Sequence, residues 1–357
     1  MLLVEPQTHT ALPSNRAEWL DRHLARVCIL SELTPTQFRK AEEKYQAVGD
    51  WLATDGSSLA VFAPEVYSQG SMLLGTTVRP YGQSEYDLDL VCQLHWCAQQ
   101  PPLTIYDWVH ERIAANEIYR EMLEKLKRCL RLNYAGSFHL DILPACPNDR
   151  IGNGSIIVPD RKLECWKHSN PKGFAKWFLD RCQLRDELAE RMLKASVEPL
   201  PSAVPSQYKF PLQRIVQLMK RHRDIYFSGG RDIARSVILT TLAGRFYKGQ
   251  RSLSLALEGV LEAKYEQFKS YIRNFRTGLK ALLNPSLTEQ RMGLEKSTER
   301  LGYLFGSDRV KEAIRIEANE LNERRNSGKL GIAAGGVLTA RSQAGSAAVP
   351  RNQFFGR

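Results

Sequence analysis

Three short stretches decide the fold of this chain: SQGSMLLGTTVRP at residues 68–80, YDLDLV at 86–91 and FHLDILP at 138–144. The first stretch continues a strand signal into a Gly-Ser pair and then into a short helical pattern. In the other two, apolar and polar residues alternate with a period of two, which indicates half-buried strands. Together they predict a strand, a tight turn and a short helix beside two further strands.

Gly70 and Ser71 lie at the turn between the predicted strand and the short helix. The first backbone N–H groups of a helix have no partner one turn earlier, so this turn would direct N–H groups and a hydroxyl toward one spot. Such an arrangement suits an anion such as a triphosphate. Taken alone, the pair is equally compatible with an ordinary helix start capped by Ser71.

Three carboxylates follow this turn in sequence. Asp87 and Asp89 project from one face of their strand, and Asp141 shares a face of the later strand with His139. Adjacent carboxylates in an apolar strand are costly to bury, and a divalent cation removes that cost. Mg²⁺ is a hard ion that takes carboxylate and phosphate oxygens. If the strands are neighbours, the three acids can hold two metal ions, although each acid alone is more often a solvated charge.

The remaining pattern divides the chain into a mixed α/β domain over residues 1–200, a helical domain over 201–325 and a disordered tail over 326–357. The tail is rich in Gly, Ala and Ser. Strands are predicted at 65–68, 86–94, 137–143, 155–158 and 163–166, interrupted by one helix at 107–131. Helices are predicted at 15–30, from the capping box Thr34–Gln37, and at 172–195, 210–227, 235–248, 254–283 and 287–325 with a break near Gly306.

Composition narrows the class of protein. Fifty Lys and Arg against 39 Asp and Glu give a net charge of +11, which favours polyanionic partners or serves solubility alone. Neither a long apolar run nor a signal-like amino terminus is visible, so we expect a cytoplasmic protein that does not enter a membrane. The seven cysteines form no CxxC pair and predict reduced thiols. A zinc site from Cys146, Cys165, His168 and Cys182 matches no ligand spacing.

The order GS, then DxD in a strand, then a third Asp in a later strand resembles the polymerase-beta-like nucleotidyltransferase superfamily. Within it, QGSMLLGTTVRPYG, YDLDLV and FHLDILPA are similar to the bacterial CD-NTases of SMODS type, the cGAS-like synthases of CBASS antiphage defence. The resemblance covers residues 60–250. It implies an α+β fold, in which a nucleotidyltransferase core with a mixed sheet and flanking helices is followed by a C-terminal helical domain that closes the nucleotide site.

The same resemblance assigns roles to residues. It implies triphosphate contacts from Gly70 and Ser71, metal coordination by Asp87, Asp89 and Asp141, and activation of an acceptor hydroxyl by Asp141. The cofactor would be two Mg²⁺ ions, with Mn²⁺ as a substitute.

Farther along, QRIVQLMKRHRD is similar to the family's triphosphate-binding helix, which implies phosphate contacts from Lys220 and from Ser236 at the start of the next helix. From the residues alone, Lys220 is as compatible with a surface pair to Asp224, and Ser236 with a helix cap. The loop at 166–174 would lie near the nucleotide entrance, although Asn170 and Pro171 also suit a plain helix start.

The implied activity is condensation of ATP and other ribonucleoside triphosphates into a cyclic di- or trinucleotide messenger, with release of pyrophosphate, in antiphage signalling. The messenger would act on a downstream effector, nucleic acid is neither required nor excluded, and an accessory ligase could conjugate the C-terminus. A linear 2′-5′-type oligoadenylate synthetase is the alternative within this enzyme class. A dead scaffold that binds nucleic acid would suit the charge of +11, but retention of all three acids argues against it.

Overall fold

The computed structural model describes residues 11–79, 81, 85–182, 209–228, 234–262, 269–286, 293–332, 338–340 and 347–348. Contacts divide the chain into two compact units, Met1–Asn284 and Pro285–Arg357. This division does not coincide with the predicted boundaries near 200 and 325. The segment around residue 200 lies outside the described residues, as does the end of the predicted helix at 172–195.

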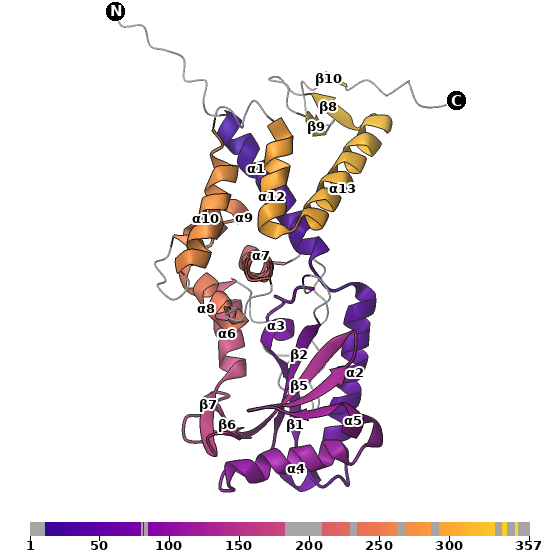
Figure 1. Ribbon diagram of the computed structural model, residues 1–357, viewed down its shortest axis with the longest axis vertical. Coiled ribbons are helices and arrows are strands. Elements are labelled where there is room, and N and C mark those ends of the chain that lie inside the picture. Colours follow the sequence, from indigo (N-terminus) through magenta and orange to yellow (C-terminus); the bar gives the residue numbers. More distant parts are fainter. Residues whose placement is uncertain are drawn as a thin grey trace, which may run out of the picture. The chain divides into compact units, whose positions relative to one another are not determined.

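The first unit is built on a mixed sheet (Figure 1). Its main path runs β1-β2-β5-β4-β3, and β6 and β7 continue from the far end of β5. Strands β2 and β5 are parallel, whereas the other pairs are antiparallel. The bounds are β1 Glu65–Gln69, β2 Tyr86–Gln93, β3 Leu123–Lys125, β4 Leu130–Tyr134, β5 Phe138–Pro147, β6 Ile156–Asp160 and β7 Cys165–Ser169. The predicted α+β class with a mixed sheet and flanking helices is therefore confirmed.

Helices α2 (Pro35–Ala53) and α4 (Pro102–Ala114) pack on the apolar face of this sheet. Helix α2 begins at the predicted capping box, in which Thr34 accepts from the Gln37 backbone and Gln37 accepts from the Thr34 backbone. The shared core contains the inward residues of β2 and β5, including Leu88, Leu90 and Leu140. Because one face of the sheet is used for this core, polar residues on the alternate positions are left for the other face.

The single helix predicted at 107–131 is wrong in its second half. Helix α4 ends at Ala114, the short α5 (Glu117–Met122) is capped by Asn116, and strands β3 and β4 follow. The residues of this segment are mostly good helix formers, so local propensity favours a helix. Pairing of β4 with β5 supplies tertiary contacts that outweigh that weak preference.

Several further helices are described in the first unit. Helix α1 (Ala11–Leu30) contacts α7 (Pro211–Tyr226), α9 (Leu253–Leu261) and α10 (Lys269–Leu283). The first helix of the chain therefore belongs with later helices rather than with the sheet. Helices α6 (Pro171–Arg181) and α8 (Ser236–Phe246) contact one another, and α6 also contacts β1.

The second unit contains α12 (Gly293–Phe305) and α13 (Ser307–Asn326). The predicted break is confirmed at Gly306, whose φ of 90° is readily adopted only by glycine. The region predicted as a disordered tail includes three short paired strands, β8 (Leu330–Ile332), β9 (Leu338–Ala340) and β10 (Ala347–Ala348). Other parts of that region lie outside the described residues.

The cysteine prediction is wrong for one pair, because Cys97 and Cys146 form a disulfide. The spacing of 49 residues gave no pairing signal, and the fold brings the turn after β2 beside the end of β5. Cys146 is thereby removed from the zinc set considered above. Among the helices that the structure describes, none is long and apolar enough to span a bilayer.

Candidate active site

The turn between β1 and α3 (Gly70–Leu73) presses directly against one carboxylate. Gly70 has a φ of 64°, and a Cβ atom built on it would lie 2.3 Å from Asp89 Oδ2. Only glycine fits both the backbone conformation and the available space. The adjacent Ser71 hydroxyl accepts a hydrogen bond from Thr77 Oγ1 at 3.1 Å. The predicted Gly-Ser turn is therefore in contact with the predicted acidic strand.

Parallel pairing of β2 with β5 brings the three acids to one place. Asp89 lies directly opposite Asp141 in the register, and Asp87 lies opposite His139. Neighbouring strands are about 4.8 Å apart, so the two opposed carboxylates share one local field. All three acids are on the face opposite the apolar core, as the alternation predicted. The geometry unites Asp87, Asp89 and Asp141, while their roles stay predictions.

Asp89 has the least favourable environment of the three acids. Its carboxyl has a pKa raised to about 7, mainly by burial and then by the negative charges of Asp141 and Asp87. Lys220 and Arg131 act in the opposite direction without restoring the ordinary value. A carboxylate in this state gains from any cation placed beside it. That property suits a metal ligand.

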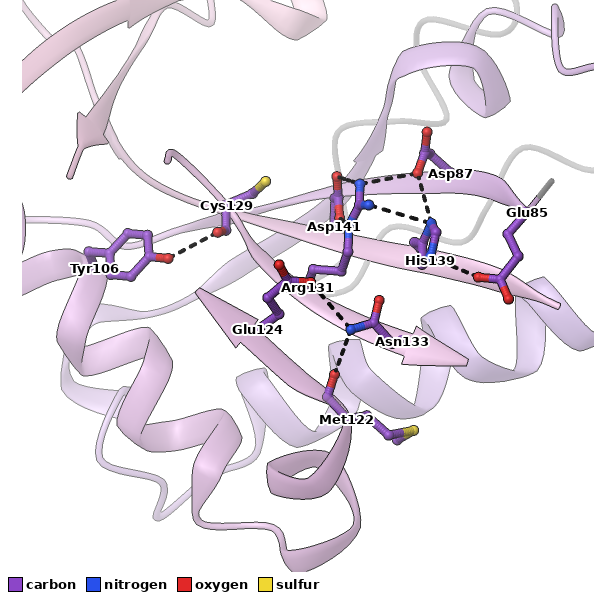
Figure 2. Close-up of polar contacts among 10 residues, drawn as sticks. All are labelled: Glu85, Asp87, Tyr106, Met122, Glu124, Cys129, Arg131, Asn133, His139 and Asp141. Atoms are coloured by element: carbon purple, nitrogen blue, oxygen red, sulfur yellow. Dashed lines mark hydrogen bonds and ion pairs between the residues drawn. The ribbon is translucent and has the colours of Figure 1, made fainter. Parts of the chain in front are cut away.

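An arginine that the sequence analysis did not single out lies among these acids (Figure 2). Arg131 on β4 donates from Nε to Asp141 Oδ1 at 2.6 Å and from Nη2 to Asp141 Oδ2 at 2.8 Å. The same Nη2 donates to Asp87 Oδ1 at 3.2 Å. The residue was missed because it fell inside the predicted helix. The alternation in Leu130-Arg131-Leu132-Asn133 is the signal that could have revealed a strand.

His139 extends this cluster along the same face. Its Nε2 lies 2.7 Å from Glu85 Oε2, and its Nδ1 lies 3.4 Å from Asp87 Oδ1 (Figure 2). Glu85 also accepts from the Gly136 backbone at 2.6 Å. A chain of polar contacts thus runs from the turn before β5 to Asp141. Among the described residues, no three or more His, Cys, Asp or Glu side chains are already gathered as a metal-ligand set.

Lys220 is not the surface residue that one interpretation expected. Only 4% of it is exposed, and its Nζ donates to Thr76 O at 3.0 Å and to Thr76 Oγ1 at 3.2 Å. Gln213 and Gln217, on the same face of α7, donate to the carbonyls of Leu74 and Thr77. One face of α7 therefore holds the segment that follows α3.

The pKa of Lys220 is lowered to about 7, mainly by burial and then by the positive charge of Arg223. Asp224 is occupied elsewhere, because Arg223 donates to it at 2.6 and 2.8 Å. Arg223 also donates to the Ser236 hydroxyl at 2.7 Å. The N-cap residue of α8 is Arg235 and Ser236 is the first residue inside the helix, so Ser236 is not the cap that one interpretation expected.

The loop predicted near the nucleotide entrance leads into α6. Asn170 caps this helix by accepting from the Gly173 backbone at 2.7 Å, with Pro171 at the first helical position. Asn170, Pro171, Gly173 and Phe174 also line the cavity described next. Asn170 and Pro171 therefore both begin a helix and line the cavity, so the two interpretations are compatible.

These parts surround one cavity of about 1140 Å³ in the first unit. Of the seven predicted site residues, six line it: Gly70, Ser71, Asp87, Asp89, Lys220 and Ser236. Asp141 is not among its lining residues, since both of its carboxylate oxygens face Arg131. The volume exceeds the range of roughly 300–1,000 Å³ common for small-molecule sites. The cavity has acidic side chains from β2 and basic side chains from α7.

This chain resembles known proteins that synthesise nucleotide second messengers. Residues 24–181 match the model of the Second Messenger Oligonucleotide or Dinucleotide Synthetase domain. A c-di-GMP synthase of Roseivirga ehrenbergii is 34% identical over 97% of this chain and 99% of its own length. The cyclic dinucleotide synthase CdnG of Bradyrhizobium diazoefficiens is 31% identical over 64% of this chain and 59% of its own length.

Solved structures agree on the fold. The CD-NTase CdnG of B. diazoefficiens in complex with GTP superposes with a TM-score of 0.61 at 24% identity, covering 84% of this chain and 99% of that one. CdnC of E. coli MS115-1 with ATP gives a TM-score of 0.56 at 10% identity, covering 80% and 98%. The cavity, the aligned acids and the full-length relative lead to one conclusion: the chain belongs to the second messenger oligonucleotide or dinucleotide synthetases, a family of nucleotidyltransferases.

Proposed function

We propose that the protein condenses two ribonucleoside triphosphates, GTP among them, into a cyclic dinucleotide and releases pyrophosphate. The observation that carries the proposal is the register that sets Asp89 opposite Asp141, with Gly70 held against Asp89. GTP is favoured because relatives are a c-di-GMP synthase and a CdnG determined with GTP. ATP, which the sequence suggested, is the other candidate substrate.

The donor chemistry fits a divalent cation. Asp87, Asp89 and Asp141 offer hard oxygen ligands, and the pKa of Asp89 is raised because burial and the two neighbouring carboxylates outweigh the positive charges of Lys220 and Arg131. We assign these three acids as the residues that would hold Mg²⁺, with Mn²⁺ as a substitute. When bound, such an ion lowers the pKa of an attacking hydroxyl and neutralises charge on the leaving pyrophosphate.

Backbone and side-chain groups of the protein would position the triphosphate. The Gly70-Ser71 turn offers backbone N–H groups to a triphosphate, while Lys220 and Ser236 offer an ammonium and a hydroxyl from the opposite side of the cavity. Asp141 would orient the acceptor hydroxyl for in-line attack on the α-phosphate. No covalent intermediate with the protein is needed, because catalysis of this kind consists of positioning and charge neutralisation.

The biological setting is proposed on family resemblance. The product would serve as a messenger in antiphage defence, acting on a downstream effector in the cytoplasm. Conjugation of the C-terminus by an accessory ligase stays a prediction, and nucleic acid is neither required nor excluded. Neither the linear oligoadenylate alternative nor a dead scaffold is favoured by relatives named as cyclic dinucleotide synthases.

Product analysis tests the proposal. Purified protein is incubated with all four ribonucleoside triphosphates and Mg²⁺, treated with phosphatase and analysed by mass spectrometry. We expect a phosphatase-resistant cyclic dinucleotide that contains guanine and is absent with the Asp87→Ala, Asp89→Ala protein. Asp107→Asn, an exposed acid on α4, serves as the matched control. A product that phosphatase trims to a nucleoside end would instead establish a linear synthetase.

A further inference from the structure

The carboxylate site contains its own cation. The Arg131 guanidinium makes two hydrogen bonds to Asp141 and one to Asp87, so it bridges acids from β5 and β2 (Figure 2). Both oxygens of Asp141 take part. Paired N–H groups on a carboxylate form one of the strongest polar contacts that side chains make. One positive charge from within the chain is therefore shared by two of the three acids, with Asp141 taking two of its three hydrogen bonds.

Sheet register fixes this arginine in place. Arg131 lies directly opposite Asp141 in the antiparallel pair of β4 with β5, just as Asp89 lies opposite Asp141 on the other side. The three side chains therefore form a row across the sheet, with Asp141 in the middle. Leu130 and Leu132 are fully buried on the other face, which prevents the arginine from turning away.

Arg131 does not compensate the three acids equally. No hydrogen bond joins Arg131 to Asp89, whose carboxylate instead faces the Gly70 turn. Asp141 and Asp87 thus have a fixed counter-ion, whereas Asp89 has only more distant positive charges. A divalent cation that bridges all three acids would have to share Asp87 and Asp141 with a guanidinium of the same sign.

We propose that Arg131 is a positioning residue that acts as a built-in counter-cation and weakens metal binding by the acids. This inference rests on the metal site of the proposed function. Before metal binds, Arg131 holds the carboxylates of Asp87 and Asp141 in position through its hydrogen bonds. Metal entry requires the contact between Arg131 Nη2 and Asp87 Oδ1 to loosen. The site is thereby kept ordered without attracting metal strongly.

If Arg131 only oriented the metal ligands, its removal would change metal affinity in the opposite direction. Residues that only orient metal ligands typically cost about 10- to 100-fold in metal affinity when they are removed. A competing charge must instead increase metal affinity when it is removed. The direction of the change therefore separates the two roles.

Metal binding without nucleotide tests the inference. Binding of Mn²⁺ to the full-length chain is followed by electron paramagnetic resonance for the native protein, Arg131→Gln and Arg131→Lys. We expect Arg131→Gln to bind Mn²⁺ about tenfold more tightly or better, because a like charge has been removed from a half-buried site. Arg131→Lys keeps the charge but cannot bridge two carboxylates, so its affinity should fall between the other two.

Controls separate the possible failures. Arg128→Gln removes the neighbouring arginine, whose partner is Asp160, and should leave Mn²⁺ affinity unchanged. Asp89→Asn should abolish the binding that is being measured. Unchanged or weaker binding by Arg131→Gln overturns the inference and leaves the metal site standing; should that variant not fold, weaker binding by Arg131→Lys does the same. Absence of Asp89-dependent binding in every protein would remove the metal site itself.

Discussion

The cavity has an acidic side on β2 and a basic side on α7, and each side contains a buried ionisable group, Asp89 on the acidic side and Lys220 on the basic side. On the acidic side burial raises the pKa of Asp89 to about 7, and on the basic side burial lowers the pKa of Lys220 to about 7. The second cause is also shared, since a like charge stands nearby in each case, Asp141 for the acid and Arg223 for the lysine.

The neighbouring charge is compensated on both sides, Asp141 by Arg131 and Arg223 by Asp224. The central groups are not compensated in this way: Asp89 faces the Gly70 turn, and Lys220 donates to the neutral oxygens of Thr76. Each side therefore keeps one group whose charge is poorly supported within the protein. The acid gains from a cation and the lysine from an anion, and a metal-bound triphosphate supplies both. Variants on the two sides should consequently fail in different ways.

The largest effect is expected at the acidic side. Asp89→Asn should reduce product formation by on the order of a thousandfold, because it removes a ligand from metal-dependent chemistry that contributes several kcal/mol. The melting temperature should not fall, since a buried like charge is lost. Product yield and thermal melting are measured together with Asp107→Asn as control. Substantial activity in the Asp89 variant would contradict the assigned role.

The turn that touches the acidic side comes next. Gly70→Ala introduces backbone strain of about 1–2 kcal/mol and a Cβ atom that collides with Asp89 Oδ2. We expect an activity loss on the order of a hundredfold, since a displacement of about 1 Å can cost that much. Gly56→Ala is a matched control, because its φ is 79° and nothing lies within 4 Å of its added Cβ. Equal losses in both variants would mean that strain alone is responsible.

Loss of charge on the basic side should affect binding more than folding. Lys220→Met keeps the length of a buried side chain and removes its ammonium. Affinity for GTP should weaken by about 10- to 100-fold, as expected for a hydrogen bond to a charged group. Titration calorimetry compares it with Lys176→Met, an exposed lysine on α6. Unchanged affinity would show that Lys220 serves only to hold the Thr76 segment.

The smallest effect is a stability difference that depends on pH. The folded pKa of Asp89 lies above its ordinary value, so its stabilising contribution is full at acidic pH and is lost as pH rises from about 4 to 7. The folded pKa of Lys220 lies below its ordinary value, so its contribution is full at alkaline pH and is lost as pH falls from about 10 to 7.

Urea unfolding of the two variants measures this difference. Relative to the native chain, Asp89→Asn should gain about 1–2 kcal/mol more at pH about 7.5 than at about 5, and Lys220→Met a similar amount more at about 7 than at about 9.5. Both curves should flatten when GTP and Mg²⁺ are present. A gain that does not vary with pH would show that neither group changes its protonation on unfolding.

Sequence reasoning located most of the site because its signals are local. Alternation around Asp87 and Asp141 indicates which faces they occupy, and a glycine beside a serine indicates a turn. The adjacency of the two strands could not be read from local pattern, because it depends on long-range pairing. Arg131 was missed for the same reason, since a helix-forming composition concealed a strand that is stabilised by pairing with β5 and β3. The pairing of Cys97 with Cys146 likewise depends on the fold.

The charged residues of β3, which favoured a helix in the sequence, also affect how the edge of the sheet behaves. This strand ends the main path of the sheet, so among the described residues no further strand pairs with one side of its backbone, and edges of this kind can pair with another chain. It is only three residues long, and Glu124 and Lys125 are exposed. Short, charged edge strands are poor templates for intermolecular pairing. The charged residues of β3 that favoured a helix in the sequence thus disfavour aggregation through this edge of the sheet.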